Sequence, residues 1–327
     1  MPKVSIIAEL CQNHNGNIIN VEQMVHEAAE NGATHVKIQN IYANMLTKRA
    51  QFELGIKING SVAAITRPYQ AEYDRLKGLE LSFSDCEKFI DTCRKVGVIP
   101  VTTCFSHGTL REIQEIGFEE IKVASYDCGS LPLIERLSKA FKHIYISTGS
   151  TFDNEIVNSV KLLKKSKVDF TLFHCVTIYP TPLNEMNLSR MNYIKKLGEI
   201  NNIGLSEHSL YERDGVLASM AAIALGANCI ERHFTNVGPS ETKDGPVSID
   251  SKGLKKLSFF SKLSKSEQID ELNYIMPDWE KIMLGKPDRL LSSVELLNRE
   301  YYRGRFGTPR QRYTSENMIY NWEMFDE

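Results

Sequence analysis

The sequence lacks the features that mark a membrane protein, a secreted protein or a zinc finger. None of its seven cysteines has CxxC spacing and their number is odd, so neither a structural zinc site nor a secreted disulfide framework is expected. The longest uncharged stretch, residues 215–230, is shorter than the roughly 20 apolar residues that span a bilayer. A secretory signal with its apolar segment and cleavage site is also missing. We expect a reduced, cytoplasmic protein without a membrane partner.

The sequence has no excess of either charge. It contains 39 Lys and Arg against 41 Asp and Glu, and the net charge of -2 gives no bulk reason to expect a nucleic-acid partner. With 327 residues, 42% of them hydrophobic, the chain can bury a large core. An ordinary globular domain is therefore expected.

Short apolar runs alternate with amphipathic segments along the chain. Eight runs are short and apolar, most of them with Val or Ile, as strands buried on both faces are: residues 4–10, 35–39, 100–105, 120–125, 144–149, 169–175, 202–208 and 227–235. Helical spacing predicts helices at residues 20–32, 84–97, 109–117, 131–141, 152–166, 187–200 and 213–225. This rhythm predicts an α/β fold, a TIM (β/α)₈ barrel over residues 1–285. A doubly wound sheet is disfavoured because no GxGxxG follows the first strand.

Two stretches fall outside this rhythm. Residues 40–83 form a long loop after strand 2, on the face where barrels carry their active sites. Residues 286–327 form a short C-terminal tail with several arginines among aromatic residues: Arg303, Arg305, Arg310 and Arg312. The tail is expected either to be a solvated segment on the outside of the barrel or to make an oligomer contact or face an anion.

Polar side chains lie where the predicted strands end, which is where barrel chemistry takes place. His208 and His233 end adjacent strands and could bind one divalent ion. Lys37 and Lys122 suit a phosphate and a carboxylate, together with hydroxyl groups of Ser106, Ser125, Ser147 and Thr148. Candidates for acid–base work are the carboxylates of Glu9, Asp127 and Asp244.

Other chemistries remain open at this point. A strand lysine, Lys122 or Lys37, could form a Schiff base with a ketone, as in an aldolase. A two-metal hydrolase is less favoured because strand 1 lacks an HxH pair. An inactive or binding barrel would leave gaps among the strand-end residues, and few gaps are present.

The strand-end motifs resemble those of the sialic acid synthase family. The matching pieces occur in family order over roughly residues 4–250: Ile7-Ala8-Glu9 with Asn13-His14-Asn15-Gly16, Val36-Lys37-Ile38-Gln39, Lys122-Val123-Ala124-Ser125, Ser147-Thr148-Gly149, His174-Cys175 with Tyr179-Pro180-Thr181-Pro182, Gly204-Leu205-Ser206-Glu207-His208 and Glu231-Arg232-His233-Phe234-Thr235. Each piece alone is a weak signal, and the set is specific.

The resemblance implies a synthase that condenses phosphoenolpyruvate with N-acetylmannosamine or a related acetamido sugar and releases phosphate. By the family's pattern, His208 and His233 bind Mn²⁺ or another divalent metal such as Mg²⁺ or Co²⁺. The substrates are bound by Lys37, Gln39, Lys122, Ser125, Ser147, Tyr179 and Ser206. Glu9, Asp127 and Asp244 take the catalytic positions, and a homodimer is expected.

The chain departs from the family pattern at two places. Tyr126-Asp127 stand where much of the family has Gly-Glu, which keeps an acid but shortens it and adds bulk near the sugar. Many members carry a C-terminal antifreeze-like domain whose arginine reaches the active site of the partner subunit, and we do not expect that domain within residues 286–327. We therefore expect Arg303 and Arg305 of the tail as candidate substitutes for that arginine.

Overall fold

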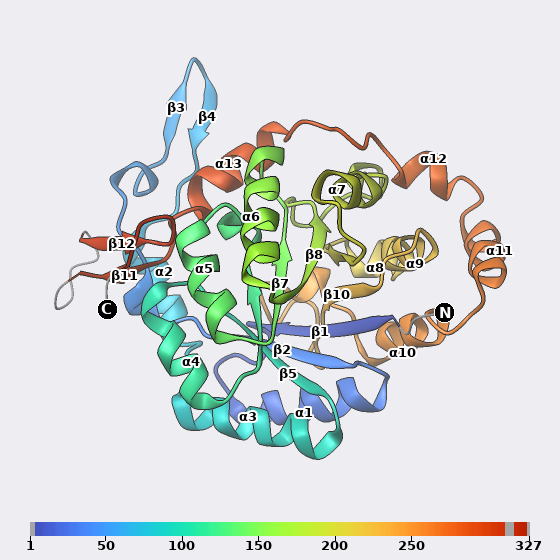
Figure 1. Cartoon of the computed structure of the whole chain (residues 1–327), viewed down its shortest axis with the longest axis horizontal. Helices are drawn as coiled ribbons and strands as arrows, with labels where there is room; N and C mark the ends of the chain where they lie inside the picture. Colours follow the sequence, from blue (N-terminus) through green and yellow to red (C-terminus); the bar gives the residue numbers. More distant parts are fainter. Residues whose placement is uncertain (1–3, 311–316, 326–327) are drawn as a thin grey trace.

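The structure of the protein is a computed structural model that describes residues 4–310 and 317–325. Eight parallel strands close into a barrel in the order β1-β10-β9-β8-β7-β6-β5-β2, which confirms the predicted TIM barrel (Figure 1). The strands are β1 Ser5–Cys11, β2 His35–Gln39, β5 Ile99–Thr103, β6 Glu120–Val123, β7 His143–Ser147, β8 Asp169–Cys175, β9 Ile203–Glu207 and β10 Cys229–His233.

Helices cover the outside of the barrel and bury their apolar faces against it. They are α1 Ile18–Glu30, α3 Phe83–Val96, α4 Leu110–Ile116, α5 Leu131–Ala140, α6 Asp153–Ser166, α7 Arg190–Gly198, α8 Tyr211–Asp214 and α9 Leu217–Ala224. The single helix predicted at residues 213–225 is two helices, because Gly215 takes a φ of 56° that ends α8. None of the described helices has the length and apolar character needed to cross a membrane.

Three helices that the sequence patterns did not predict follow β10: α10 Ser251–Phe260, α11 Lys265–Ile275 and α12 Trp279–Met283. Side-chain caps start the first two. Asp250 accepts a hydrogen bond from Gly253 N–H at α10, and Ser264 and Glu267 form a capping box at α11.

The long loop and the C-terminal segment meet at one end of the barrel (Figure 1). The loop contains the hairpin β3 Ile56–Ile58 and β4 Ser61–Ala64 and the helix α2 Tyr69–Lys77; the C-terminal segment contains α13 Ser293–Tyr302 and the hairpin β11 Gly307–Pro309 and β12 Met318–Tyr320. Thr47 N–H donates to the Arg305 carbonyl at 2.9 Å, and Thr47 Oγ1 donates to the Gly304 carbonyl at 2.6 Å. The described part of the tail therefore packs across the barrel mouth, while Arg312 lies outside the described residues.

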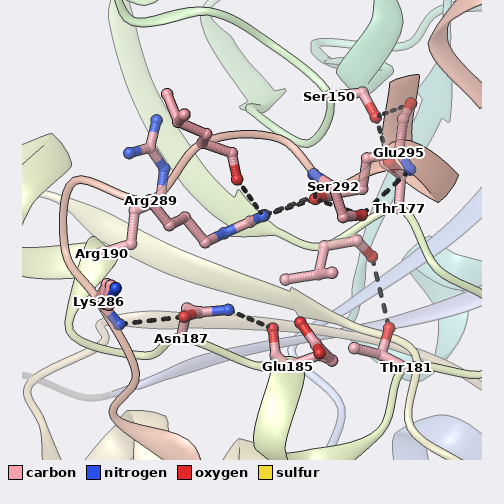
Figure 2. Close-up of polar contacts among 12 residues, drawn as sticks. Ser150, Thr177, Thr181, Glu185, Asn187, Arg190, Lys286, Arg289, Ser292 and Glu295 are labelled. Atoms are coloured by element: carbon pink, nitrogen blue, oxygen red, sulfur yellow. Dashed lines mark hydrogen bonds and ion pairs between the residues drawn. The ribbon is translucent and has the colours of Figure 1, made fainter.

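The start of α13 is tied to the loops that follow β7 and β8 (Figure 2). Lys286 N–H donates to Asn187 Oδ1 at 3.1 Å. The Arg289 guanidinium contacts the buried Glu295 carboxylate, with Nη2 2.7 Å from Oε1. Ser150 Oγ donates to the Glu295 carbonyl at 3.0 Å. These bonds fix the position from which α13 and the following residues reach the mouth.

The barrel interior is closed by an apolar layer. Ile7, Val101, Tyr145, Phe173 and Cys229 form a buried cluster of their own, separate from the larger core between strands and helices. Above this layer, toward the carboxyl ends of the strands, the inward-facing side chains become polar. The change from apolar to polar residues sets the floor of the site.

Candidate active site

The site follows from the two-residue period of the strands. A residue two positions beyond the apolar layer points into the barrel again. Those positions carry Glu9, Thr103, Ser147, Cys175 and Glu231, and the strand register places Lys37, Lys122 and Ser206 beside them. The next inward positions carry Cys11, Gln39, His208 and His233. All of them line one cavity of about 540 Å³. Ser125, Asp127, Tyr179 and Asp244 line the same cavity. Two predicted hydroxyls do not: Ser106 Oγ donates to Met45 Sδ at 3.0 Å, and Thr148 Oγ1 donates to the Phe173 carbonyl at 2.8 Å.

Two lysines and two glutamates form a buried network on the floor of the cavity. Lys37 Nζ contacts the Glu9 carboxylate and lies 3.3 Å from Glu231 Oε2. Lys122 Nζ lies 2.7 Å from the same Glu231 oxygen. Ser206 Oγ donates to Glu231 Oε1 at 2.8 Å, so Glu231 connects three of the cavity's polar groups. The network is charge-balanced, and a bound anion must compete with the glutamates for the lysines.

The pKa values of the two lysines are shifted in opposite directions. Burial alone would lower the pKa of Lys37, but Glu231 and Glu9 outweigh it and raise that pKa. Burial lowers the pKa of Lys122, and nearby Lys37 adds to the effect against the attraction of Glu231. The pKa of Glu231 is lowered, since the two lysines overcome the burial that would raise it. Lys122 is therefore the more easily neutralised amine.

Potential metal ligands lie together at one side of the cavity. Donor atoms of Cys11, His233 and Asp244 all lie within 4.8 Å of one another. The rings of His208 and His233 are 5.0 Å apart, centroid to centroid. Burial and neighbouring His233 lower the pKa of His208 well below its usual value, which leaves a neutral imidazole able to bind a cation. Two imidazoles beside a carboxylate fit a divalent metal.

Cys11, which the sequence patterns did not single out as a site residue, lies in this cavity. A register shift between β1 and β2 follows Glu9, and Cys11 takes a φ of 47°. Its N–H donates to Glu9 Oε1 at 2.6 Å, and its Sγ donates to Asp244 Oδ2 at 2.9 Å. Burial, and then the Asp244 and Glu9 carboxylates, raise the pKa of the Cys11 thiol. The irregular end of β1 thus connects the lysine network to the potential metal ligands.

The remaining predicted residues surround this centre. Tyr179 lies edge-on to His208, with ring centroids 4.5 Å apart, and is half exposed. Ser125 Oγ accepts a hydrogen bond from Gly149 N–H at 3.2 Å. Tyr126 stacks on Tyr302 of the C-terminal segment at 5.0 Å. The tail therefore contacts the position where the chain departs from the family pattern.

Asp127 is held by a residue of the C-terminal segment. Ser130 Oγ and Asn321 Nδ2 donate to Asp127 Oδ1 at 2.9 and 3.0 Å. Burial raises the pKa of Asp127 to about 6, although these two donors oppose the shift. Asp127 therefore takes up or releases a proton near neutral pH.

We expect Asp127→Asn to stabilise the protein in a pH-dependent way. Because the folded state favours the protonated acid, the stability that this group contributes is present below its unfolded pKa of 3.8 and is lost as the pH rises through about 6. The amide mimics the protonated acid. The free energy of unfolding of the variant should therefore exceed that of the wild type by about 1–3 kcal/mol at pH 8 and equal it at pH 4. Urea unfolding at both values measures this, and an equal difference at both would contradict it.

The two candidate arginines of the tail separate in the structure. Arg305 lines the cavity and contacts Glu72. Arg303 instead pairs with Glu155 at 3.1 Å and lies over the Trp322 ring, outside the cavity. Of the two, only Arg305 is placed to meet a substrate.

Comparison with known proteins agrees with this geometry. A family model described as the NeuB family matches residues 24–269. The chain belongs to the NeuB family. It is 30% identical over 264 residues to N,N'-diacetyllegionaminic acid synthase of Campylobacter jejuni, covering 79% of this chain and 75% of the relative. It is 29% identical over 255 residues to pseudaminic acid synthase of Helicobacter pylori, covering 77% and 72%.

A solved structure extends the similarity of this NeuB-family chain to the fold. The N-acetylneuraminic acid synthetase of Leptospira borgpetersenii, in complex with citrate, matches with a TM-score of 0.67 and 26% identity over 91% of both chains. The resemblance to the sialic acid synthase family is thereby confirmed.

Several residues of the site were missed from the sequence. Glu231 and Cys11 each lie two positions from a predicted site residue on the same strand face, so the strand period could have found them. Arg67, Arg75 and Lys243 line the cavity from the long loop, α2 and the segment after β10. No periodic signal marks these three residues.

Proposed function

We propose that this NeuB-family protein condenses phosphoenolpyruvate with an acetamido sugar to a sialic-acid-type nonulosonate and releases phosphate. The observation that carries the proposal is the inward polar layer, in which Lys37, Lys122, Ser206 and the carboxylates of Glu9 and Glu231 lie in one cavity. The relatives named above are synthases of legionaminic, pseudaminic and neuraminic acids.

The floor of the cavity suits phosphoenolpyruvate. Lys37 and Lys122, with the hydroxyl groups of Ser125, Ser147 and Ser206, offer cations and donors for its phosphate and carboxylate. Carbon C3 of the enol forms a bond to C1 of the open-chain sugar, whose carbonyl oxygen takes a proton. Water then adds at C2, and phosphate leaves with cleavage of the C–O bond. Glu9 would transfer protons or orient this water.

The side of the cavity around His233 suits the sugar. His208 and His233, with Asp244 close by, would hold Mn²⁺ or a similar ion, and that ion would supply Lewis-acid polarisation of the sugar carbonyl. Gln39, Tyr179 and Asp127 line the space in which the sugar would lie. N-acetylmannosamine and diacetamido-trideoxyhexoses are the candidate acceptors.

Two further aspects belong to the proposal. All seven cysteines are free and buried, which supports a reducing compartment such as the cytoplasm. We also propose a homodimer, by analogy with the family, and a division of the chain into a barrel of residues 1–285 and a C-terminal segment of residues 286–327.

A second candidate is a Schiff-base aldolase that uses Lys122. The lowered pKa of this buried lysine favours it, because an unprotonated amine is the nucleophile. The contact between Lys122 and Glu231 opposes it by favouring the charged amine. Trapping of a covalent pyruvate adduct on Lys122 by borohydride would establish the aldolase; no adduct is expected.

The proposed function predicts phosphate release that needs both substrates. Phosphoenolpyruvate with Mn²⁺ should release phosphate in the presence of an acetamido sugar and not in its absence. A panel of N-acetylmannosamine and the diacetamido sugars measures the acceptor range. Release that is independent of any sugar, or no release with the whole panel, would contradict the proposal.

A further inference from the structure

Four cationic side chains surround the outer part of the cavity, and the mechanism above uses none of them. We call these residues, Arg67, Arg75, Lys243 and Arg305, the rim cations. They come from the long loop, α2, the segment after β10 and the C-terminal segment. Four separate parts of the chain thus place positive charge at one opening.

The rim cations are only partly neutralised by carboxylates around them, since Glu72 and Asp244 together carry fewer charges than the four cations. Glu72 is shared by Arg75, at 2.8 Å, and Arg305. Within residues 4–310 and 317–325, Arg67 and Lys243 form no side-chain ion pair or hydrogen bond, and both are exposed. The other carboxylate at this level, Asp244, accepts from Cys11. Positive charge therefore remains at the opening, whereas the lysines of the floor are balanced by Glu9 and Glu231.

Arg305 is buried in a way that leaves it available to a ligand. Its side chain is 9% exposed, and its guanidinium lies 4.6 Å from the Phe306 ring centroid and 5.4 Å from that of Tyr302. Its Nε is buried without a hydrogen-bond partner among the described residues. Buried donors normally have partners, and an exception calls for an explanation such as a missing ligand.

We propose that the rim cations bind a negatively charged group, a phosphate or a carboxylate, on the acceptor sugar. The inference rests on the proposed function and makes the preferred acceptor an acidic acetamido sugar. Cations that present several donors suit phosphate and carboxylate oxygens. A neutral sugar would leave this charge unused.

The arrangement of contacts assigns the rim to the acceptor and not to phosphoenolpyruvate. The floor lysines are connected to the rim only through intervening residues: Glu9 contacts Cys11, Cys11 contacts Asp244, and neighbouring Gln12 contacts Arg75. Phosphoenolpyruvate on the floor has its own two lysines and three serines. The sugar, which reacts beside Asp244, extends outward from there, so its far end meets the rim.

The test compares three acceptors that differ only at C6: N-acetylmannosamine, its 6-phosphate and the corresponding 6-carboxylate. Phosphate release at saturating phosphoenolpyruvate and Mn²⁺ should give a kcat/KM at least about tenfold higher for one of the two acidic sugars than for N-acetylmannosamine. Lys243→Gln and Arg67→Gln should each reduce this preference severalfold. Neither should change the KM for phosphoenolpyruvate by more than about twofold. Raising the salt concentration should also reduce the preference.

Arg303→Gln is the matched control, because this tail arginine lies outside the cavity and should keep the preference. Both rim variants replace exposed side chains without an ion pair, so they leave no buried acid unpaired. Equal or better use of the neutral sugar would overturn the inference while supporting the proposed function. A raised KM for phosphoenolpyruvate with unchanged acceptor preference would assign the rim to that substrate and overturn it as well. No release with any of these acceptors or with the diacetamido sugars would overturn the proposed function itself.

Discussion

Glu231→Gln is expected to reduce turnover at least about 100-fold and to destabilise the protein by about 2–4 kcal/mol. Glu231 is buried, lies near both Lys37 and Lys122, and accepts from Ser206. An amide of the same shape removes the charge that offsets burial of Lys122. Lys122 and Ser206 are then no longer held in the positions from which we propose that they bind phosphoenolpyruvate.

Turnover with saturating substrates and urea unfolding measure the two effects. Glu135→Gln is the matched control, because it removes a carboxylate from the exposed Glu135–Lys139 pair and should change neither quantity. Glu231→Gln should also increase the reactivity of Lys122 toward amine reagents at pH 8, since the amine loses the carboxylate nearest to it. Wild-type turnover together with an unchanged unfolding midpoint would contradict the role assigned to Glu231.

The fold could be predicted because its signals are local and repeated. Each barrel strand lies in a short apolar run, and β2 His35–Gln39 and β8 Asp169–Cys175 have the predicted bounds. The helices after β10 were not predicted because they follow the eighth strand and continue no strand–helix repeat. The capping box at Ser264 and Glu267 was a readable signal for one of them.

The floor of the site could be predicted for a similar reason. In a parallel barrel all strands end at one face, so polar residues at strand ends meet even when they are far apart in sequence. Which of these polar residues contact one another could not be predicted. In the sequence Glu231 is simply the first residue of a Glu-Arg-His run, and nothing marks it as the partner of both lysines. Its neighbour Arg232 points the other way and forms a buried ion pair with Glu207, which Ser219 of α9 also contacts. The two-residue period separates these roles once the strand register is known.

The rim could not be predicted from sequence. Arg67, Arg75 and Lys243 lie in loops and a short helix, where no period relates a residue to the barrel axis. Arg305 follows α13, and bonds of Lys286, Arg289 and Glu295 fix the start of that helix (Figure 2). Such placement depends on contacts between segments more than 100 residues apart in the chain.

His233→Ala is expected to lower turnover about 1,000-fold, the rate equivalent of about 4 kcal/mol of lost transition-state stabilisation, and to abolish stimulation by Mn²⁺. His233 belongs to the Cys11–His233–Asp244 group and also faces His208, so every metal site that these residues could form includes it. Mn²⁺ binding measured by titration calorimetry gives a readout that does not depend on turnover. His26→Ala is the control, because His26 is exposed on α1 and should keep both properties.

The same titration distinguishes two possible ligand sets around His233. The sequence motifs predict His208 as the second ligand, whereas the group of donor atoms that lie within 4.8 Å of one another contains Cys11, His233 and Asp244. Mn²⁺ prefers oxygen and imidazole nitrogen ligands over soft sulfur. We therefore expect His208→Ala to weaken Mn²⁺ binding much more than Cys11→Ser, and Asp244→Asn to have an intermediate effect. A larger loss in Cys11→Ser would indicate a thiolate ligand and a softer native metal such as Zn²⁺. Full activity after complete chelation would contradict both sets.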